Sequence, residues 1–579
     1  MTYNSKILGA FLLVLILYSC SKTSDPSPAP PVVPPVTPPI IQPVDPTTAK
    51  SIGFFLDGWQ GKTFTVPSYN AVAAPTATAT ATITIDASNV ITKVPQYIYG
   101  NNTNTYMGQM ITDAPLLGYI KDLAPHILRF PGGNISSVYF WNAAPNNKPA
   151  DAPDSLYDSN GNLIPSGYWY GQNTANWTLS LDNYYTMLQQ TNNTGIITIN
   201  YSYARYGKGA APVQTAAHLA ADWVRYDKGK TKFWEIGNES DGPWQAGYQI
   251  NTVTNQDGQP KIITGSLYGT HFKVFADSMR KAATEVGSNI KIGAQLIGTD
   301  PTNSWNVTDR TWNNGYFASA GDYADFYIVH DYYTPSGQNS TAAVILNSAV
   351  TETATVMNWM KTTTTQGGVP LKPIALTEWN IFAQGSMQQV SHVAGMHAVL
   401  VLGELLKNQF GQASRWDLAN SWANGDDQGM FNNNDEPGAP ARNPRPAFYH
   451  MYYFQQYFGD RMVGSSVQQT GNNIAAYAST FTSGQASVII VNTGTTAQTA
   501  NISLQNFTTG INYYWYALTG GSDNGEFSRQ VYVNGTGPSG VSGGPLNYAS
   551  LKPNGALTTN GIKVSLPARS VVFLAVDKK

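Results

Sequence analysis

The sequence is short of the residues that build several common kinds of functional site. Cys20 is the single cysteine among 579 residues, which excludes a disulfide framework and a cysteine-based metal site. Charged residues make up only 12% of the chain, and 33 basic residues nearly balance 35 acidic ones, so no basic surface for a nucleic acid is expected. The sequence also has no glycine-rich phosphate loop, His-Glu metal motif or Cys-His dyad.

Long apolar runs are equally scarce, and the run near the N-terminus has a specific interpretation. Lys6 precedes apolar residues 7–17, and Leu17-Tyr-Ser-Cys20 follows. This run is too short for a stable membrane helix and is typical of a secretory signal. It resembles the bacterial lipoprotein signal, so we expect residues 1–20 to be a lipoprotein signal whose cleavage leaves Cys20 as the lipidated first residue. The protein would then be an outer-membrane lipoprotein of the cell envelope, facing the periplasm or the cell surface. A simple cleaved signal is the alternative.

The segment after the signal has the composition of a tether. Residues 21–48 include ten prolines between Pro26 and Pro46. Such a segment forms neither helix nor sheet and favours extended polyproline II structure. The sequence therefore predicts a proline-rich linker between the membrane and the folded part.

The folded part divides into three regions by pattern. Residues 49–94 are rich in β-formers, with period-two alternation over 76–85, and are expected to join a C-terminal sheet. Residues 95–462 alternate short apolar strands with helical segments, and residues 463–579 return to short strands separated by turns. Residues 519–556, rich in Gly, Ser and Asn, are predicted to form a long loop region.

Eight strand–helix units in succession predict the fold class α/β, as a (β/α)8 TIM barrel with an accessory β-sandwich. The expected barrel strands are 96–100, 126–130, 195–201, 232–237, 290–295, 325–330, 373–377 and 415–418. Helices are expected over 215–226, 269–286 and 390–406. The expected sandwich strands are 475–480, 486–492, 499–504, 513–517, 561–566 and 570–576.

Two of the barrel strands end in a glutamate, and this pair predicts the chemistry. Glu239 follows the fourth strand and Glu378 ends the seventh. Active sites of such barrels lie at the C-terminal ends of the strands. Two carboxyl groups there are the minimum equipment for hydrolysing a glycosidic bond, one as acid and base and the other as nucleophile. This reaction requires no cofactor or metal, and none is predicted.

Neighbouring residues assign roles to the two glutamates. Arg129, ending the second strand, would lie beside Glu378 and favour its charged form as the nucleophile. Glu239 is then the acid, with a pKa that we expect to be raised by its partner's charge and by burial. Asn238 is placed to bind a sugar hydroxyl.

Two residues of the sixth strand are further candidates for the site. His330 and Tyr332 lie at and just after the predicted end of that strand, where they could orient Glu378.

Other residues leave alternatives open. Glu235 is a rival acid, but its position within a strand favours a role inside the barrel. Trp422 is either a platform for a sugar ring or a packing residue. Trp169, Trp305 and Trp312 lie in predicted loops and could bind sugar, because aromatic rings stack on the apolar faces of sugars.

Three segments around these residues carry a family resemblance: 129–134 (RFPGGN), 234–245 (WEIGNESDGPWQ) and 377–380 (TEWN). They resemble segments of glycoside hydrolase family 51, in clan A, which contains α-L-arabinofuranosidases and some endoglucanases. Families 39 and 79 are more distantly similar. The resemblance implies an acid/base at Glu239 and a nucleophile at Glu378. It also implies substrate contacts at Asn134, Asn200 and Trp244.

The sequence departs from that family at the first strand and within the fourth. Asn101 and Asn102 stand where an acidic group is usual, and Glu235 stands where a small or apolar residue is usual. These departures leave open whether the substrate is an arabinofuranosyl branch or the interior of a plant or algal polysaccharide chain. The alternatives to an enzyme are a catalytically inactive surface carbohydrate-binding lipoprotein and a structural lipoprotein whose sandwich mediates adhesion.

Overall fold

The computed structural model describes residues 40–422 and 427–579. The predicted signal peptide, Cys20 and most of the proline-rich linker therefore lie outside the described residues, and their boundaries stay predictions. All elements below belong to one compact unit that begins at Ile41. Within the described ranges, every helix is too short or too polar to span a membrane.

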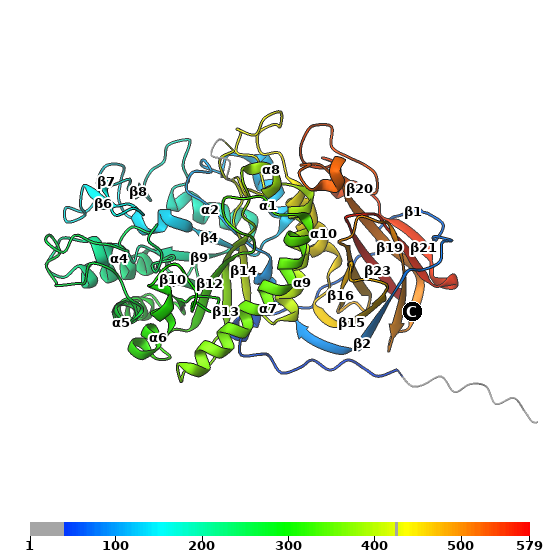
Figure 1. The fold of residues 1–579 in the computed structure, drawn as a ribbon, viewed down its shortest axis with the longest axis horizontal. Helices are drawn as coiled ribbons and strands as arrows, with labels where there is room; N and C mark the ends of the chain where they lie inside the picture. Colours follow the sequence, from blue (N-terminus) through cyan, green and yellow to red (C-terminus); the bar gives the residue numbers. More distant parts are fainter. Residues whose placement is uncertain (1–39, 423–426) are drawn as a thin grey trace, which may run out of the picture. The chain divides into compact units, whose positions relative to one another are not determined.

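Eight parallel strands close into a barrel, which confirms the predicted fold (Figure 1). In order around the barrel they are β3 (Gly100–Asn102), β4 (Ile127–Phe130), β9 (Thr194–Ile199), β10 (Phe233–Ile236), β11 (Lys291–Gln295), β12 (Phe326–Tyr332), β13 (Ile374–Asn380) and β14 (Gln412–Arg415). The helices that follow them are α1 (Ala114–Leu123), α2 (Leu181–Thr191), α4 (Pro212–Asp227), α5 (Gly265–Glu285), α6 (Asp309–Ala320), α7 (Ala342–Gln366), α9 (His392–Lys407) and α10 (Pro446–Tyr457). Short helices α3 (Tyr203–Tyr206) and α8 (Ser386–Gln389) precede α4 and α9.

Local sequence explains where several of these helices begin. The hydroxyl oxygens of Ser180, Thr341 and Ser391 each accept a hydrogen bond from the backbone N–H three residues on, at the starts of α2, α7 and α9. Such caps satisfy donors that a helix cannot pair internally. Pro212 begins α4, where its missing N–H costs nothing.

Two predicted barrel strands were wrong in position. Residues 96–99 form a 3₁₀ turn, and the first strand, β3, begins at Gly100. The eighth strand, β14, ends at Arg415, where the prediction began. The polar side chains of Gln412 and Ser414 bond each other at 2.6 Å inside the barrel, so the strand lacks the apolar pattern that the prediction used.

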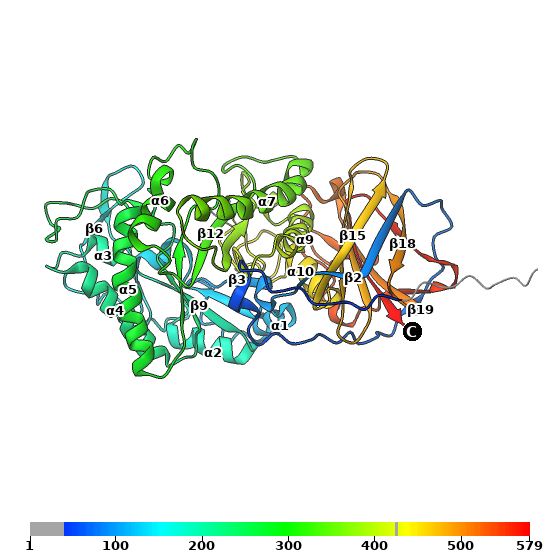
Figure 2. The same cartoon turned by 90° about the horizontal axis from the view of Figure 1, so that it is seen from below.

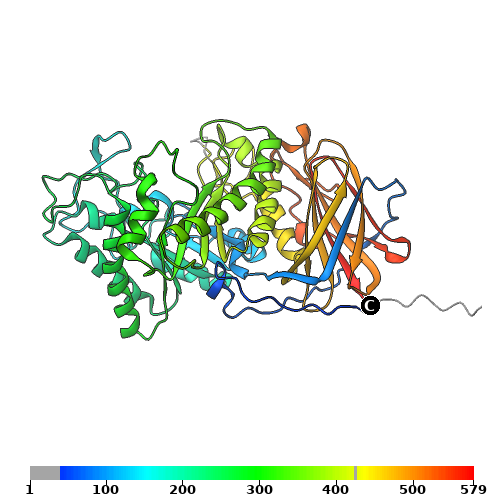
Figure 3. The same ribbon diagram turned by 60° about the horizontal axis from the view of Figure 1, so that its bottom comes forward.

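The N-terminal segment closes the end of the barrel opposite the carboxyl ends of the strands. Figure 3 shows this segment in dark blue, running past the C-terminal β-rich part of the molecule to the barrel. The backbone N–H of Ile41 donates to the side-chain oxygen of Asn506 in that β-rich part. The carbonyl of Ser51 accepts from the N–H of Ile374 at the start of β13. Phe55, in the turn η1 (Gly53–Leu56), packs its ring 5.1 Å from that of Phe233.

An eleven-stranded sheet forms the second, β-rich part, as predicted (Figure 2). Its strands are β1 (Asn70–Ala71), β21 (Asn554–Leu557), β19 (Thr509–Gly520), β23 (Ser570–Lys578), β17 (Ala486–Asn492), β16 (Ile474–Thr480), β15 (Arg461–Gln469), β2 (Ala81–Lys93), β18 (Gln498–Gln505), β22 (Ile562–Leu566) and, beside β19, β20 (Val531–Val533). The expected long loop at 519–556 is wrong, because β20 and most of β21 lie in it.

Strand β17 explains how the sheet is attached to the barrel. Val488 and Ile490 belong to the core of the sheet itself, whereas Ile489 and Val491 belong to the core that includes the barrel. Successive side chains of a strand point to opposite faces, so β17 is buried on both.

Two short pairs of strands form within the loops of the barrel. They are β5 (Tyr139–Phe140) with β8 (Trp169–Tyr170), and β6 (Ser155–Tyr157) with β7 (Leu163–Pro165).

Candidate active site

The fold brings Glu239 and Glu378 to one end of the barrel. Glu239 lies three residues after β10, in a backbone conformation with φ of 41°. Glu378 lies inside the last part of β13. Because all eight strands are parallel, these positions meet at the carboxyl end of the barrel.

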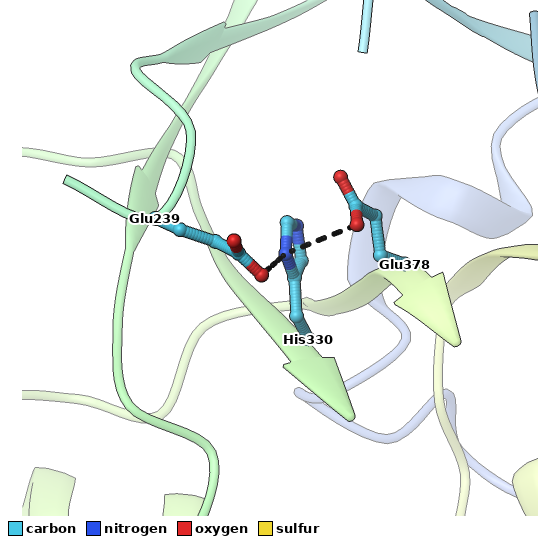
Figure 4. Close-up of side chains that lie close together, drawn as sticks. All are labelled: Glu239, His330 and Glu378. Carbon is cyan, nitrogen blue, oxygen red and sulfur yellow. Dashed lines mark hydrogen bonds and ion pairs between the residues drawn. The ribbon is translucent and has the colours of Figure 1, made fainter. Parts of the chain in front are cut away.

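His330, near the end of β12, stands between the two glutamates (Figure 4). Its Nδ1 lies 2.9 Å from Oε1 of Glu239 and 3.8 Å from Oε2 of Glu378. One carboxylate oxygen of each glutamate and a ring nitrogen of His330 all lie within 4.8 Å of one another. The carboxylates therefore face a single space.

Glu378 is held at both of its oxygens. Arg129 donates from Nη1 to Oε1 at 2.7 Å, and the hydroxyl of Tyr332 donates to Oε2 at 3.0 Å. Burial first, and then the charge of Glu378, raise the pKa of Tyr332 well above its ordinary value, so its hydroxyl stays a donor. Glu378 is 4% exposed, and these donors fix its orientation.

Arg129 is fully buried, and besides Glu378 it bonds two residues of the segment that carries Glu239. Its Nε donates to Glu235 at 2.6 Å, and its Nη2 donates to the side-chain oxygen of Asn238 at 2.7 Å. Burial alone would lower the pKa of Arg129, but the neighbouring Glu235 and Glu378 raise it overall. Glu235 also accepts from Thr198 at 2.8 Å, so it is paired inside the barrel, away from the role of an acid.

The expected upward shift in the pKa of Glu239 is wrong for the free protein. Burial raises the pKa of Glu239, but the hydrogen bond and charge of His330 outweigh it and lower the pKa overall. Burial lowers the pKa of His330, whereas Glu378 and Glu239 raise it above the ordinary value. Both shifts favour a protonated His330 beside an ionised Glu239, joined by the 2.9 Å hydrogen bond.

Tyr332 touches Glu378 as the sequence suggested, but His330 bonds the other glutamate. Asn238 is buried, and its oxygen is used by Arg129, while its amide nitrogen has no partner among the described residues. That nitrogen is a donor left unpaired beside the carboxylates.

The residues that the resemblance implied occupy different places. Trp244 donates from Nε1 to Oε2 of Glu239 at 2.7 Å. The exposed Asn134 accepts from Gln245, whose amide also lies 3.4 Å from Glu239. Asn200 bonds Tyr139, Tyr203 and Tyr206 within the loops around β9, and its bonds include neither glutamate.

The aromatic candidates are also divided. Trp312 is not in a loop: it is fully buried in α6 and donates to the carbonyl of Gln295. The ring centroid of Trp422 lies 4.9 Å from the guanidinium carbon of Arg529, which precedes β20 in the β-rich part of the chain. Trp169 packs edge-on against Trp177, with ring centroids 5.7 Å apart.

Sequence reasoning missed two features directly after β14. The ring of Trp416 lies over Gly133, where an added Cβ would come within 2.5 Å of it. Asp417 accepts from the hydroxyl of Tyr106 at 3.2 Å and from Asn104. Trp416 and Asp417 directly follow β14, which ends at Arg415. The predicted strand, 415–418, included both residues, so the prediction did not place them at the carboxyl end of a strand.

Glu239, His330 and Glu378 also have the composition of a divalent-metal site. Two cationic groups already balance the charge of the two carboxylates. Arg129 pairs with Glu378 at 2.7 Å, and His330 has a raised pKa that favours its protonated form. The donor set therefore fits a metal poorly.

A parallel barrel with carboxylates at the ends of its fourth and seventh strands is the arrangement that the resemblance to clan A glycoside hydrolases implied. The family described as "Alpha-L-arabinofuranosidase 1 domain" matches residues 119–345. Two curated relatives are an intracellular exo-α-(1→5)-L-arabinofuranosidase of Bifidobacterium longum and a probable α-L-arabinofuranosidase C of Aspergillus clavatus. The first is 23% identical over 39% of this chain and 36% of its own length, and the second 24% over 52% and 61%. The chain thus spans about a third to three fifths of these curated relatives.

Solved structures agree in fold. An α-L-arabinofuranosidase of Thermotoga maritima has a TM-score of 0.59 at 17% identity, covering 86% of this chain and 99% of that one. CelM2, a bifunctional glucanase-xylanase from a metagenome library, has 0.55 at 16%, covering 87% and 100%. Further similar structures are family 51 α-L-arabinofuranosidases of Bifidobacterium longum and Thermotoga petrophila, so these similarities confirm the resemblance to glycoside hydrolase family 51.

Proposed function

We propose that this protein is a retaining glycoside hydrolase that cleaves O-glycosidic bonds in a plant or algal polysaccharide. One observation supports this most directly: oxygens of Glu239 and Glu378 lie within 4.8 Å of each other. Carboxyl groups about 5–5.5 Å apart suit direct attack on the sugar, whereas inverting enzymes need about 6.5–9.5 Å to admit a water.

In the first step, Glu378 attacks the anomeric carbon while the bond to the leaving oxygen breaks. Glu239 gives a proton to that oxygen, so the leaving sugar departs as a neutral alcohol. The product is a glycosyl ester on Glu378 and a carboxylate at Glu239. Arg129 and Tyr332 donate to the two oxygens of Glu378 and keep its carboxylate aimed at the carbon before attack.

In the second step, a water takes the place of the leaving group. Glu239 accepts a proton from this water, whose oxygen bonds to the anomeric carbon as the ester bond to Glu378 breaks. Two inversions at the same carbon give net retention. Glu239 thus ends the cycle protonated, as it must be for the next one.

The proton for the first step comes from a shared pair. With His330 protonated and Glu239 ionised, transfer across their 2.9 Å hydrogen bond gives a neutral imidazole and a protonated acid. Nε2 of His330 lies 3.1 Å from the hydroxyl of Thr377 and can donate to it in both states. The ring therefore need not turn when the proton moves.

Two substrates remain candidates. The arabinofuranosidases among the relatives favour arabinofuranosyl branches, and the structural likeness to a glucanase-xylanase favours the interior of a glycan chain. Asn101 and Asn102 lie in the first strand, β3, where the similar family usually has an acidic residue, and Asn102 accepts a 3.0 Å bond from Arg129.

The test is hydrolysis of a panel of aryl glycosides and polysaccharides by the wild type and by single variants. Glu239→Gln and Glu378→Ala should each lower kcat/KM by at least about a thousandfold, because each removes a group that acts in the transition state. Glu404→Gln is the matched control: Glu404 is as buried as Glu378 and bonds Tyr477 away from the site, so this variant should stay active. Normal turnover by either site variant would refute the proposal, and binding without any product would favour the carbohydrate-binding alternative.

Azide then separates the two roles. In Glu378→Ala, azide should attack from the vacated face and give a glycosyl azide of inverted configuration. In Glu239→Gln, it should react with the glycosyl ester and give the retained configuration. Exchanged configurations would reverse the assignment of acid and nucleophile.

We also propose that the protein is anchored to the outer membrane through Cys20. The signal-like run before Cys20 and the proline-rich residues after it support this. Cys20→Ala should move the protein from the membrane to the soluble fraction, and unchanged fractionation would contradict the anchor.

A further inference from the structure

Two exposed indole rings lie together beside Glu239, and one of them bonds its Oε2. Trp244 is 42% exposed and Trp305 is 73% exposed, and their ring centroids are 6.2 Å apart with planes inclined by 40°. Large apolar side chains that stand together in solvent commonly mark a binding surface.

The hydrogen bonds give the order of groups along the site. His330 contacts Oε1 of Glu239, on the side of Glu378, whereas Trp244 donates to Oε2. Trp305 lies against Trp244, with 6.2 Å between their ring centroids. An acid stands next to the oxygen that it protonates, so the leaving part of the substrate lies on the side of Glu239 that these indoles occupy.

Both rings are held in place by their surroundings. The indole of Trp244 lies over Gly242, where an added Cβ would come within 2.4 Å of the ring. On either side of Trp305, the carbonyl of Ser304 accepts two bonds from Arg310, and Asn306 donates to the carbonyl of Asp241 at 2.8 Å. The exposure of Trp305 is thus a property of an anchored segment.

We propose that Trp305 extends Trp244 into a platform for the sugar rings on the leaving-group side of the cleaved bond. This rests on the proposed function and names its substrate class: an oligosaccharide or polysaccharide that continues for at least two sugars beyond that bond. The flat apolar faces of sugar rings suit exposed indoles, while their hydroxyl groups remain in water. A substrate with a single-ring leaving group reaches Trp244 and leaves Trp305 bare.

The test compares Trp305→Ala with the wild type on two substrates that share the transferred sugar. One is a 4-nitrophenyl glycoside, and the other is an oligosaccharide with three sugars beyond the cleaved bond. We expect kcat/KM for the oligosaccharide to fall about tenfold, mainly through KM, because about 60 Å² of apolar contact is lost. The value for the aryl glycoside should stay within about twofold. Trp305→Phe should restore most of the loss.

Val307→Ala is the matched control, since Val307 is 69% exposed in the same segment. It should leave both substrates unaffected. An equal loss on both substrates in Trp305→Ala, or the same loss in Val307→Ala, would mean a disturbed segment and would overturn the platform. Unchanged oligosaccharide hydrolysis in Trp305→Ala would also overturn it, while the hydrolase itself stands; a wild type inactive on both substrates would instead refute the proposed function.

Discussion

Replacing His330 with glutamine should shift the alkaline limb of the pH–rate profile to lower pH. In the wild type, His330 and Glu239 share a proton across 2.9 Å, with the pKa of His330 raised and that of Glu239 lowered. Two groups this strongly coupled titrate as a pair. The alkaline limb then marks loss of the last proton from the pair, and glutamine cannot hold that proton.

The size of the shift follows from the strength of the shared bond. A hydrogen bond to a charged group contributes about 1.5–3 kcal/mol, which equals about one to two pH units. The side chains of His330 and Glu239 are only 10% and 22% exposed, so solvent screens this bond little. The alkaline limb of the variant should therefore lie about one to two units below that of the wild type.

The assay is kcat/KM for an aryl glycoside across the accessible pH range, because this parameter reports the groups of the free enzyme. His397→Gln is the matched control. His397 is also fully buried, and its imidazole contacts Ser348, outside the site. Its pKa is lowered to about 3 by burial, so its substitution should not move the limb.

A second readout is stability. Because the pKa of His330 is raised, the wild type gains stability from its protonated form at pH values below the ordinary histidine value. That gain is lost as the pH rises through the raised value. The variant should lack this pH dependence. An alkaline limb that stays in place in folded His330→Gln would refute the shared proton, and a limb that moves upward would show that His330 only suppresses protonation of Glu239.

Two further predictions concern the other contacts of the nucleophile. Tyr332→Phe removes the 3.0 Å bond to Glu378 and should lower kcat/KM by about 10- to 100-fold with no loss of fold, measured with an aryl glycoside and by circular dichroism; an unchanged rate would show that Arg129 alone orients the nucleophile. Glu235→Leu leaves the fully buried Arg129 with one carboxylate fewer and Thr198 without its acceptor, so urea unfolding should show a loss of about 3–5 kcal/mol. A loss below about 1 kcal/mol would mean that the pair contributes little.

The sequence was sufficient for the parts of the site that directly end a strand. Glu239 and Glu378 each close a run of β-formers, so the barrel pattern alone placed both at the carboxyl end. Arg129 was found in the same way, at the second strand. The distance between Glu239 and His330 could not be predicted, because it depends on how two loops and two strands pack. The direction of the pKa of Glu239 depends on that distance, and the prediction was therefore wrong.

An irregularity between β12 and β13 is the clearest case of information that the sequence does not show. Val329 pairs with Leu376, but His330 pairs with Glu378, so Thr377 is an extra residue in β13. Residues that pair directly point to the same face of the sheet. In an unbroken register His330 would face Thr377, and Glu378 would turn to the opposite face, away from His330. The extra residue thus aims the nucleophile at the imidazole, and its own hydroxyl lies 3.1 Å from Nε2 of His330.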